Sequence, residues 1–251
     1  SKKEAEKAQP KEKVSEVKKE GWRQENSQWL FYENNQPVIN WKKIGGVWYY
    51  FNQNGVMLSN TVFDDYIFSK SGALVKNSWI KLGDNWFYAN QEGKISRDKW
   101  EKIKDRWYYF DAEGVMVSST WKKKYYLKDS GAMAQSEWIF DKQHNSWFYL
   151  KSDGSYAENQ WQGSYYLKSG GHMAKSEWIF DNSYNAWYYL KEDGLYATGT
   201  LKIKGKDYSF ENNGKWISNP STSTYYKVKP IIAYVYSASG SRLSYISQGS
   251  I

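Results

Sequence analysis

The sequence of 251 residues has no cysteine, two histidines and four prolines. The absence of cysteine excludes disulfide bridges, thiolate metal sites and a cysteine nucleophile. His144 and His172 are too far apart for a helical zinc motif, so we expect neither a metal nor a cofactor. No apolar run approaches the roughly 18 residues that a membrane-spanning helix needs, and we therefore expect no transmembrane segment.

Aromatic residues are abundant instead, at 19% of the chain, with 15 Trp and 23 Tyr. The mean hydropathy is −0.85 and the formal net charge is +8. Cores of ordinary globular enzymes are built largely from aliphatic side chains. The composition therefore predicts a fold in which aromatic rings are the main building material.

An internal repeat runs through most of the chain. The segment 41–57, WKKIGGVWYYFNQNGVM, returns at 100–116 as WEKIKDRWYYFDAEGVM. Related copies give ten units with a mean period of about 20 residues, a length typical of stacked repeat architectures. The units open at Trp22, Trp41, Phe63, Trp79, Trp100, Trp121, Trp138, Trp161, Trp178 and Leu201.

Each unit has the features of a β-hairpin. Its Trp-Tyr-Tyr-Phe run favours a strand, and a glycine such as Gly55 or Gly114 follows four residues later, as expected for a hairpin turn. The first unit has Gln36-Pro37 where this glycine is expected, which predicts an irregular first hairpin. Because a lone hairpin is marginally stable, the units must bury their rings against one another. We therefore expect an all-β solenoid, a superhelix of stacked β-hairpins.

The flanks of the repeat differ in composition. Residues 1–20 hold seven Lys, five Glu and no aromatic residue, and predict a charged linker or disordered segment. Residues 21–218 form the repeat region, and 219–224 form a polar linker. Residues 225–251 predict two short strands, near 231–236 and 243–247, at the start of a following, truncated β domain.

The rings have two possible roles. Most of them are expected to pack the solenoid, especially at the last strand position, which varies between Phe and Leu. Strand periodicity places Trp48 and Tyr50 on one face and Tyr49 and Phe51 on the other. Two tryptophans recur in every full unit, and a tyrosine of the next unit beside them would make a three-walled cage for a quaternary ammonium ion.

The pattern Trp-x-Lys/Glu, Trp-Tyr-Tyr-Phe and Gly-x-Met resembles the choline-binding repeats of Gram-positive cell-wall proteins, over about residues 21–218. The resemblance implies a hairpin superhelix with choline between neighbouring units, held by two Trp of one unit and a Tyr of the next, above a Met. It also implies a secreted protein held non-covalently on the cell wall through phosphocholine of teichoic and lipoteichoic acids.

Carried over to this sequence, the resemblance implies cages formed by Trp79, Trp86 and Tyr109; by Trp100, Trp107 and Tyr126; and by Trp138, Trp147 and Tyr166. Trp22, Trp29 and Tyr50 form a fourth candidate. Two further Trp pairs lack the matching tyrosine and would use a neighbouring ring: Trp41 and Trp48 with Tyr66 or Phe68, and Trp178 and Trp187 with Tyr208 or Phe210.

The remaining positions of the pattern vary. Met57, Met116, Met133 and Met173 match the Met position, which Tyr156, Tyr196 and Trp216 occupy elsewhere. The units opened by Trp121 and Trp161 lack the second Trp, and we expect structural spacers there.

The C-terminal segment resembles the region that leads into the catalytic part of LytB-type choline-binding endo-β-N-acetylglucosaminidases, which act in daughter-cell separation. This resemblance implies that the chain targets a peptidoglycan hydrolase whose catalytic region lies beyond Ile251. Within the chain, Asp64-Asp65, Asp141 and Asp181 fall between predicted strands, where aspartate is a turn former. We expect no catalytic residues among the 251.

The sequence bears on two other binding functions. Aromatic repeats of glucan-binding proteins also resemble this sequence, so a carbohydrate-binding module is the alternative. A nucleic-acid partner is not expected, because Lys is interspersed with Asp and Glu and no dense basic stripe occurs. The net charge of +8 suits the phosphates of teichoic acids.

Overall fold

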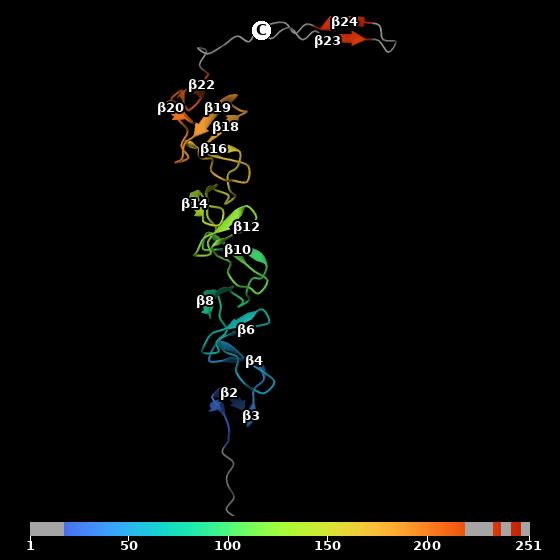
Figure 1. Ribbon diagram of the computed structural model, residues 1–251. Helices are drawn as coiled ribbons and strands as arrows, with labels where there is room; N and C mark the ends of the chain where they lie inside the picture. Colours follow the sequence, from blue (N-terminus) through green and yellow to red (C-terminus); the bar gives the residue numbers. More distant parts are fainter. Residues whose placement is uncertain (1–17, 219–232, 237–241, 247–251) are drawn as a thin grey trace, which may run out of the picture. The chain divides into compact units, whose positions relative to one another are not determined.

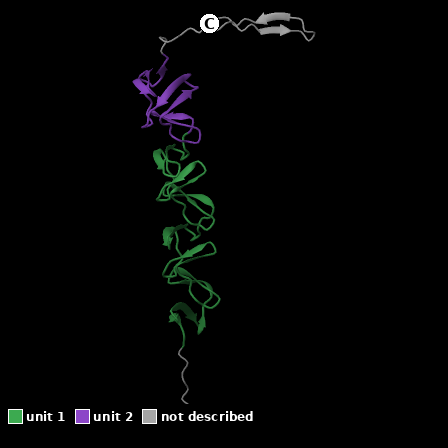
Figure 2. Ribbon diagram, in the orientation of Figure 1, with its two compact units in different colours: residues 1–157 green, residues 158–251 purple. Residues whose placement is uncertain are grey.

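The computed structural model describes residues 18–218, 233–236 and 242–246, and all of its regular elements are β-strands (Figure 1). Residues 1–17 and 219–224, expected to be linkers, and the rest of 225–251 lie outside the described residues. The chain divides into two compact units, residues 1–157 and 158–251 (Figure 2). The described residues include no helix long and apolar enough to span a membrane.

Within the described repeat region, residues 18–218, ten antiparallel hairpins follow one another in chain order, which confirms the predicted all-β repeat fold. In unit 1 the strands are β1 (Gly21–Glu25), β2 (Gln28–Glu33), β3 (Gln36–Pro37), β4 (Asn40–Ile44), β5 (Val47–Phe51), β6 (Thr61–Phe63), β7 (Tyr66–Phe68), β8 (Ser78–Leu82), β9 (Asn85–Ala89), β10 (Lys99–Ile103), β11 (Arg106–Phe110), β12 (Thr120–Lys122), β13 (Tyr125–Leu127), β14 (Glu137–Asp141) and β15 (Ser146–Leu150). In unit 2 they are β16 (Gln160–Gln162), β17 (Tyr165–Leu167), β18 (Glu177–Asp181), β19 (Ala186–Leu190), β20 (Gly199–Ile203), β21 (Lys206–Phe210), β22 (Trp216–Ile217), β23 (Ala233–Tyr236) and β24 (Arg242–Ile246).

Eight of the ten hairpins in the described repeat region have a two-residue turn that begins with a left-handed residue, whereas the β14–β15 and β18–β19 turns are four residues long. Between β4 and β5, Gly45 and Gly46 have φ of 57° and 85°, as a two-residue turn with the twist of its strands requires. Between β10 and β11, Lys104 and Asp105 adopt the same region, with φ of 47° and 65°. The turn therefore does not depend on glycine in every unit.

The predicted turn glycines have a different place from the one expected. Gly55 follows β5, where its N–H donates to the Asn52 carbonyl at 2.9 Å and a bridge joins Phe51 to Met57. It therefore closes a second turn after the hairpin. At the equivalent Gly131 φ is 77°, and an added Cβ would overlap the Met116 side chain of the preceding repeat. Glycine is needed there for both backbone angle and close packing.

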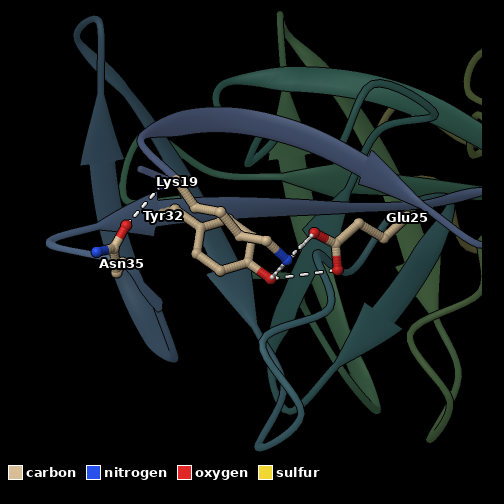
Figure 3. A network of polar contacts seen from close by, with 4 residues as sticks. All are labelled: Lys19, Glu25, Tyr32 and Asn35. Carbon is tan, nitrogen blue, oxygen red and sulfur yellow. Dashed lines mark hydrogen bonds and ion pairs between the residues drawn. The ribbon is translucent and has the colours of Figure 1, made fainter. Parts of the chain in front are cut away.

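The first repeat is irregular, as predicted. Asn34 and Asn35, with φ of 50° and 64°, replace the glycine, and the chain returns as β3 to pair with β2. Lys19 fixes the entering chain to this repeat (Figure 3): its ammonium contacts Glu25 Oε1 at 2.7 Å, and its backbone N–H donates to Asn35 Oδ1 at 2.6 Å. The hydrogen bond from Lys19 lowers the pKa of the Glu25 carboxyl, and the same bond raises the pKa of Lys19. The end of the expected linker is therefore attached to the first hairpin.

The core is a series of small clusters between successive hairpins. In several hairpins the last-strand residue packs against the first tryptophan of the preceding hairpin, as Phe51 does at 5.8 Å from Trp22 and Phe110 at 5.8 Å from Trp79. The expectation that these positions form the core is confirmed, since six of them are fully buried: Phe51, Phe110, Leu127, Leu150, Leu167 and Leu190. Within each of the two compact units, this packing fixes how one hairpin meets the next.

The two strands predicted after the repeat region are confirmed. They are β23 and β24, which pair antiparallel from Ala233 opposite Ile246. That they begin a further domain stays a prediction.

Candidate functional site

Aromatic rings from consecutive hairpins surround small cavities in unit 1. Trp41 on β4 and Trp48 on β5 lie 6.3 Å apart at 83°, and Tyr66 on β7 lies 4.8 Å from Trp41. These rings line a cavity of about 220 Å³, the Trp41 cavity, together with Leu74, Lys76 and Glu92. Two tryptophans of one hairpin and a tyrosine of the next therefore form three walls.

Two more cavities repeat this plan. Trp79, Trp86, Tyr108 and Met116 line one of about 580 Å³, the Trp79 cavity, in which Tyr108 lies 4.9 Å from Trp79. The Trp100 cavity, of about 360 Å³, is lined by Trp100, Trp107, Tyr125 and Met133, and Tyr125 lies 5.5 Å from Trp100. Met116 and Met133 therefore lie beside the tryptophan pairs, and their part in ligand binding stays a prediction.

Backbone hydrogen bonds hold the Met position against the second tryptophan. The N–H groups of Met57, Met116 and Met133 each donate at 2.8 Å to a tryptophan carbonyl, of Trp29, Trp86 and Trp107 respectively. The Trp41 cavity has Leu74 instead, bonded to the Trp48 carbonyl at 2.9 Å. The residue below each cavity is thus positioned by its main chain.

The expected third rings need a correction of one residue. Tyr108 lies against Trp79, whereas the predicted Tyr109 packs on Trp100 of its own hairpin at 5.4 Å and is only 5% exposed. Side chains alternate along a strand, so the ring that shares a face with the buried Phe110 is Tyr108. In the same way Tyr125 replaces Tyr126, and Tyr49 replaces Tyr50.

In the two tryptophan pairs that lack the matching tyrosine, the third ring is a tyrosine named above as a substitute. Tyr66 joins the Trp41 cavity, and Tyr208 lies 5.1 Å from Trp178. Trp216, at the Met position, also contacts Trp178 at 5.8 Å, while Trp187 lies against Phe180 at 5.2 Å.

The first hairpin has the same three-ring arrangement. Trp22 lies 6.2 Å from Trp29 and 5.0 Å from Tyr49. The predicted Tyr50 instead lies on Trp41 of its own hairpin, at 5.4 Å. The third ring beside Trp22 and Trp29 is therefore Tyr49 and not the predicted Tyr50.

The cage expected from Trp138, Trp147 and Tyr166 draws on both units and stays a prediction. Within unit 2, Tyr166 packs on Trp161 of its own hairpin at 5.0 Å, and burial raises the pKa of its hydroxyl. Met173 would meet a Cβ added at Gly194, which agrees with its alignment to the Met position.

The Trp121 repeat, expected to be a spacer, has its indole held by a carboxylate. Trp121 Nε1 donates to Asp141 Oδ2 at 2.7 Å, and His144 Nδ1 lies 2.5 Å from the same oxygen. Burial alone would raise the pKa of the Asp141 carboxyl, but these bonds and the amide of Gln143 outweigh it and lower that pKa. Asp181 accepts a hydrogen bond from Trp161 in the same way, at 2.6 Å, so Asp141 and Asp181 are both structural partners of tryptophan.

The Trp161 repeat has a cavity that the sequence did not reveal. Tyr188 lies 4.7 Å and Tyr196 lies 5.9 Å from Trp161, and with Tyr184 these rings line a cavity of about 300 Å³, the Trp161 cavity. Tyr184 belongs to the longer turn between β18 and β19, and Tyr196 occupies the Met position. Tyr184 and Tyr196 could have indicated this cavity in the sequence. It was not predicted, because the repeat lacks the second tryptophan on which the expected cages were based.

The cavities with two tryptophan walls each have a carboxylate residue among those that line them: Glu92 in the Trp41 cavity, Asp84 and Asp129 in the Trp79 cavity, and Asp153 in the Trp100 cavity. Ring faces and carboxylates both favour a cation. Among the described residues, no group of three or more His, Asp or Glu forms a metal site. The rings and carboxylates that line these cavities suit an organic cation.

Comparison with known families identifies the repeats. Sequence profiles described as "Choline-binding repeat" match residues 97–138 and 155–196, and one described as "Putative cell wall binding repeat" matches 39–57, 77–95 and 136–156. A profile described as "Endo-beta-N-acetylglucosaminidase LytB SH3 domain" matches 222–251.

A curated relative is the "Putative endo-beta-N-acetylglucosaminidase" of Streptococcus pneumoniae serotype 4, which is 45% identical over 47 residues. This match covers 18% of the chain and 7% of the relative, so the chain corresponds to a small part of that protein.

Two solved structures of Streptococcus pneumoniae proteins are similar to the chain. The autolysin LytC, solved with a synthetic peptidoglycan ligand, matches with a TM-score of 0.67 and 27% identity over 89% of this chain and 52% of that chain. The choline-binding domain of CbpL matches with a TM-score of 0.50 and 39% identity over 72% of this chain and 87% of that domain. With its repeat profiles and its identity to this domain, the chain belongs to the choline-binding repeat proteins.

Proposed function

We propose that the chain is an anchoring module that binds choline through its aromatic cavities and so attaches a protein to the cell wall. The observation that carries the proposal is the triad of Trp41, Trp48 and Tyr66, repeated as Trp79, Trp86 and Tyr108 and as Trp100, Trp107 and Tyr125. Family membership supports the same function.

The chemistry of the walls explains why choline is the expected ligand. Its trimethylammonium group spreads the charge over a bulky, weakly hydrated surface, which the negative faces of aromatic rings can surround. A primary ammonium would lose hydrogen bonds to water that rings cannot replace. The cavities therefore favour a quaternary ammonium over lysine-like amines.

The expected affinity explains the repetition. Each desolvated ring contributes about 1 to 2 kcal/mol, so three rings give about 4 kcal/mol after ordering costs, equivalent to about millimolar affinity. Several such sites on one chain would raise the avidity for a choline-bearing polymer by about 10² to 10⁴. These affinities favour multivalent binding of a secreted protein to the teichoic and lipoteichoic acids of the cell wall.

The parent protein is proposed to be a peptidoglycan endo-β-N-acetylglucosaminidase that this module targets to the wall, in the separation of daughter cells. The match of residues 222–251 to the LytB SH3 profile and the curated relative support this. The repeat region itself has the composition of a binding domain, and its buried aspartates Asp141 and Asp181 hold indoles.

Retention on a resin that carries a quaternary amine tests the proposal. Free choline should elute the chain, because it competes for the cavities, whereas moderate salt alone should not, because caged cations are less screened than surface ion pairs. Elution by moderate salt alone would contradict choline binding and indicate simple ion exchange between surface carboxylates and the positively charged resin.

A further inference from the structure

The cavities with two tryptophan walls share their rings but differ in the charged residues that line them. Asp84 and Asp129 both line the Trp79 cavity, along with polar residues that include Ser118 and Ser130, and no lysine or arginine of the described part of the chain lines it. Asp84 lies in the β8–β9 turn and Asp129 in the turn after β13, and both are exposed. This cavity therefore presents two negative charges.

The Trp41 cavity has the opposite feature. Lys76, which is exposed, lines it together with Glu92, so a positive charge is present and the formal charges balance. The Trp100 cavity is intermediate in charge, since Asp153 is the one charged residue among the described residues that line it. The Asp153 carboxyl accepts hydrogen bonds from the Ser155 hydroxyl and backbone N–H, which lower its pKa and keep it ionised.

Choline compounds differ in charge beyond their common trimethylammonium group. A phosphate monoester adds a charge of about −1.5 to −2 at pH 7 and follows the quaternary group by two carbons, so it lies outward when the rings hold the cation. A carboxylate near that phosphate disfavours it, and an ammonium favours it. The residues beside the cavities thus act on a part of the ligand that the rings do not touch.

We propose that these charges determine which choline compound each cavity prefers. Asp84 and Asp129 make the Trp79 cavity select choline over phosphocholine, and Lys76 makes the Trp41 cavity accept the phosphate. The inference rests on the proposed choline binding and adds a specificity to it. On a polymer that carries phosphocholine, the Trp41 cavity therefore binds more firmly than the Trp79 cavity.

Site-resolved titration distinguishes the cavities. The indole N–H signals of Trp48 and Trp86 are assigned in ¹⁵N spectra by Trp→Phe substitution and followed during titration with choline and with phosphocholine at constant ionic strength. For each site the measured quantity is the dissociation constant for phosphocholine divided by that for choline. Exposed charges about 6 to 8 Å from the phosphate predict a ratio about three- to tenfold higher at Trp86 than at Trp48.

Charge-neutralising variants assign the effect to residues. The double variant Asp84→Asn, Asp129→Asn should lower the ratio at Trp86, and Lys76→Gln should raise it at Trp48. Asp105→Asn is the matched control, because Asp105 has the position of Asp84 in the next hairpin, is 98% exposed and does not line the Trp100 cavity. It should leave both ratios unchanged.

Three outcomes are decisive. Equal ratios at both indoles that no variant changes would overturn the charge selection and leave choline binding intact. A shift with Asp105→Asn as large as with the double variant would also overturn it, because net charge would then be the cause. If neither compound moves either indole signal, the proposed function itself fails.

Discussion

Exchanging Tyr108 and Tyr109 separately for alanine should separate binding from stability. Tyr108 lines the Trp79 cavity, so Tyr108→Ala removes one of three walls and about 1 to 2 kcal/mol of cation–π stabilisation. That loss weakens choline binding there by about five- to thirtyfold, which takes a millimolar site out of the measurable range. Calorimetric titration should then count about one choline fewer per chain.

Tyr109→Ala is the matched comparison. Tyr109 is 5% exposed, donates a hydrogen bond to Asp98 and supports Lys122, whose ammonium lies 4.0 Å from the ring centre. Its loss should cost about 3 to 5 kcal/mol in urea unfolding, as for other large buried rings, and far more than the loss of Tyr108. If Tyr109→Ala removes one choline site and leaves stability unchanged while Tyr108→Ala does the reverse, the corrected register of the third ring is refuted.

Three further predictions follow from particular contacts. Gly131→Ala forces a side chain to φ of 77° against Met116, so it should cost about 1 to 3 kcal/mol in chemical unfolding and also weaken the Trp79 cavity; an unchanged midpoint would count against this packing. The lowered pKa of Asp141 stabilises the fold above about pH 4, and this stabilisation is lost as pH falls through the folded pKa, so unfolding at pH 6 and pH 3 should differ less in Asp141→Asn than in the original chain. Tyr184→Ala should abolish choline binding in the Trp161 cavity and leave the other sites intact, so the number of choline molecules bound per chain should fall by about one in calorimetric titration. An unchanged number would mean that this cavity does not bind choline.

The sequence predicted the hairpin repeat well, because periodic tryptophans and glycines report the spacing of the units directly. It was less informative about which ring of one hairpin meets the next. Tyr108 and Tyr109 are identical in type, and the choice between them depends on strand alternation relative to the buried Phe110. A register argument starting from that core position would have selected Tyr108.

The place of the turn glycines shows a second limit. Gly55 was expected in the hairpin turn, but Gly45 and Gly46 fill that role, and Gly55 closes the turn after β5. Both turns need a positive φ, so glycine alone did not distinguish them. The Trp161 cavity was missed because it depends on Tyr184, which a longer turn contributes and no other repeat supplies at that position.

Tryptophan fluorescence during titration with choline tests the central claim most directly, because a tryptophan pair lines each of the Trp41, Trp79 and Trp100 cavities. Ammonium chloride at equal concentration and a dextran serve as controls. We predict a saturable change with choline alone. A response to dextran and none to choline would contradict the account and identify the rings as sugar-binding platforms.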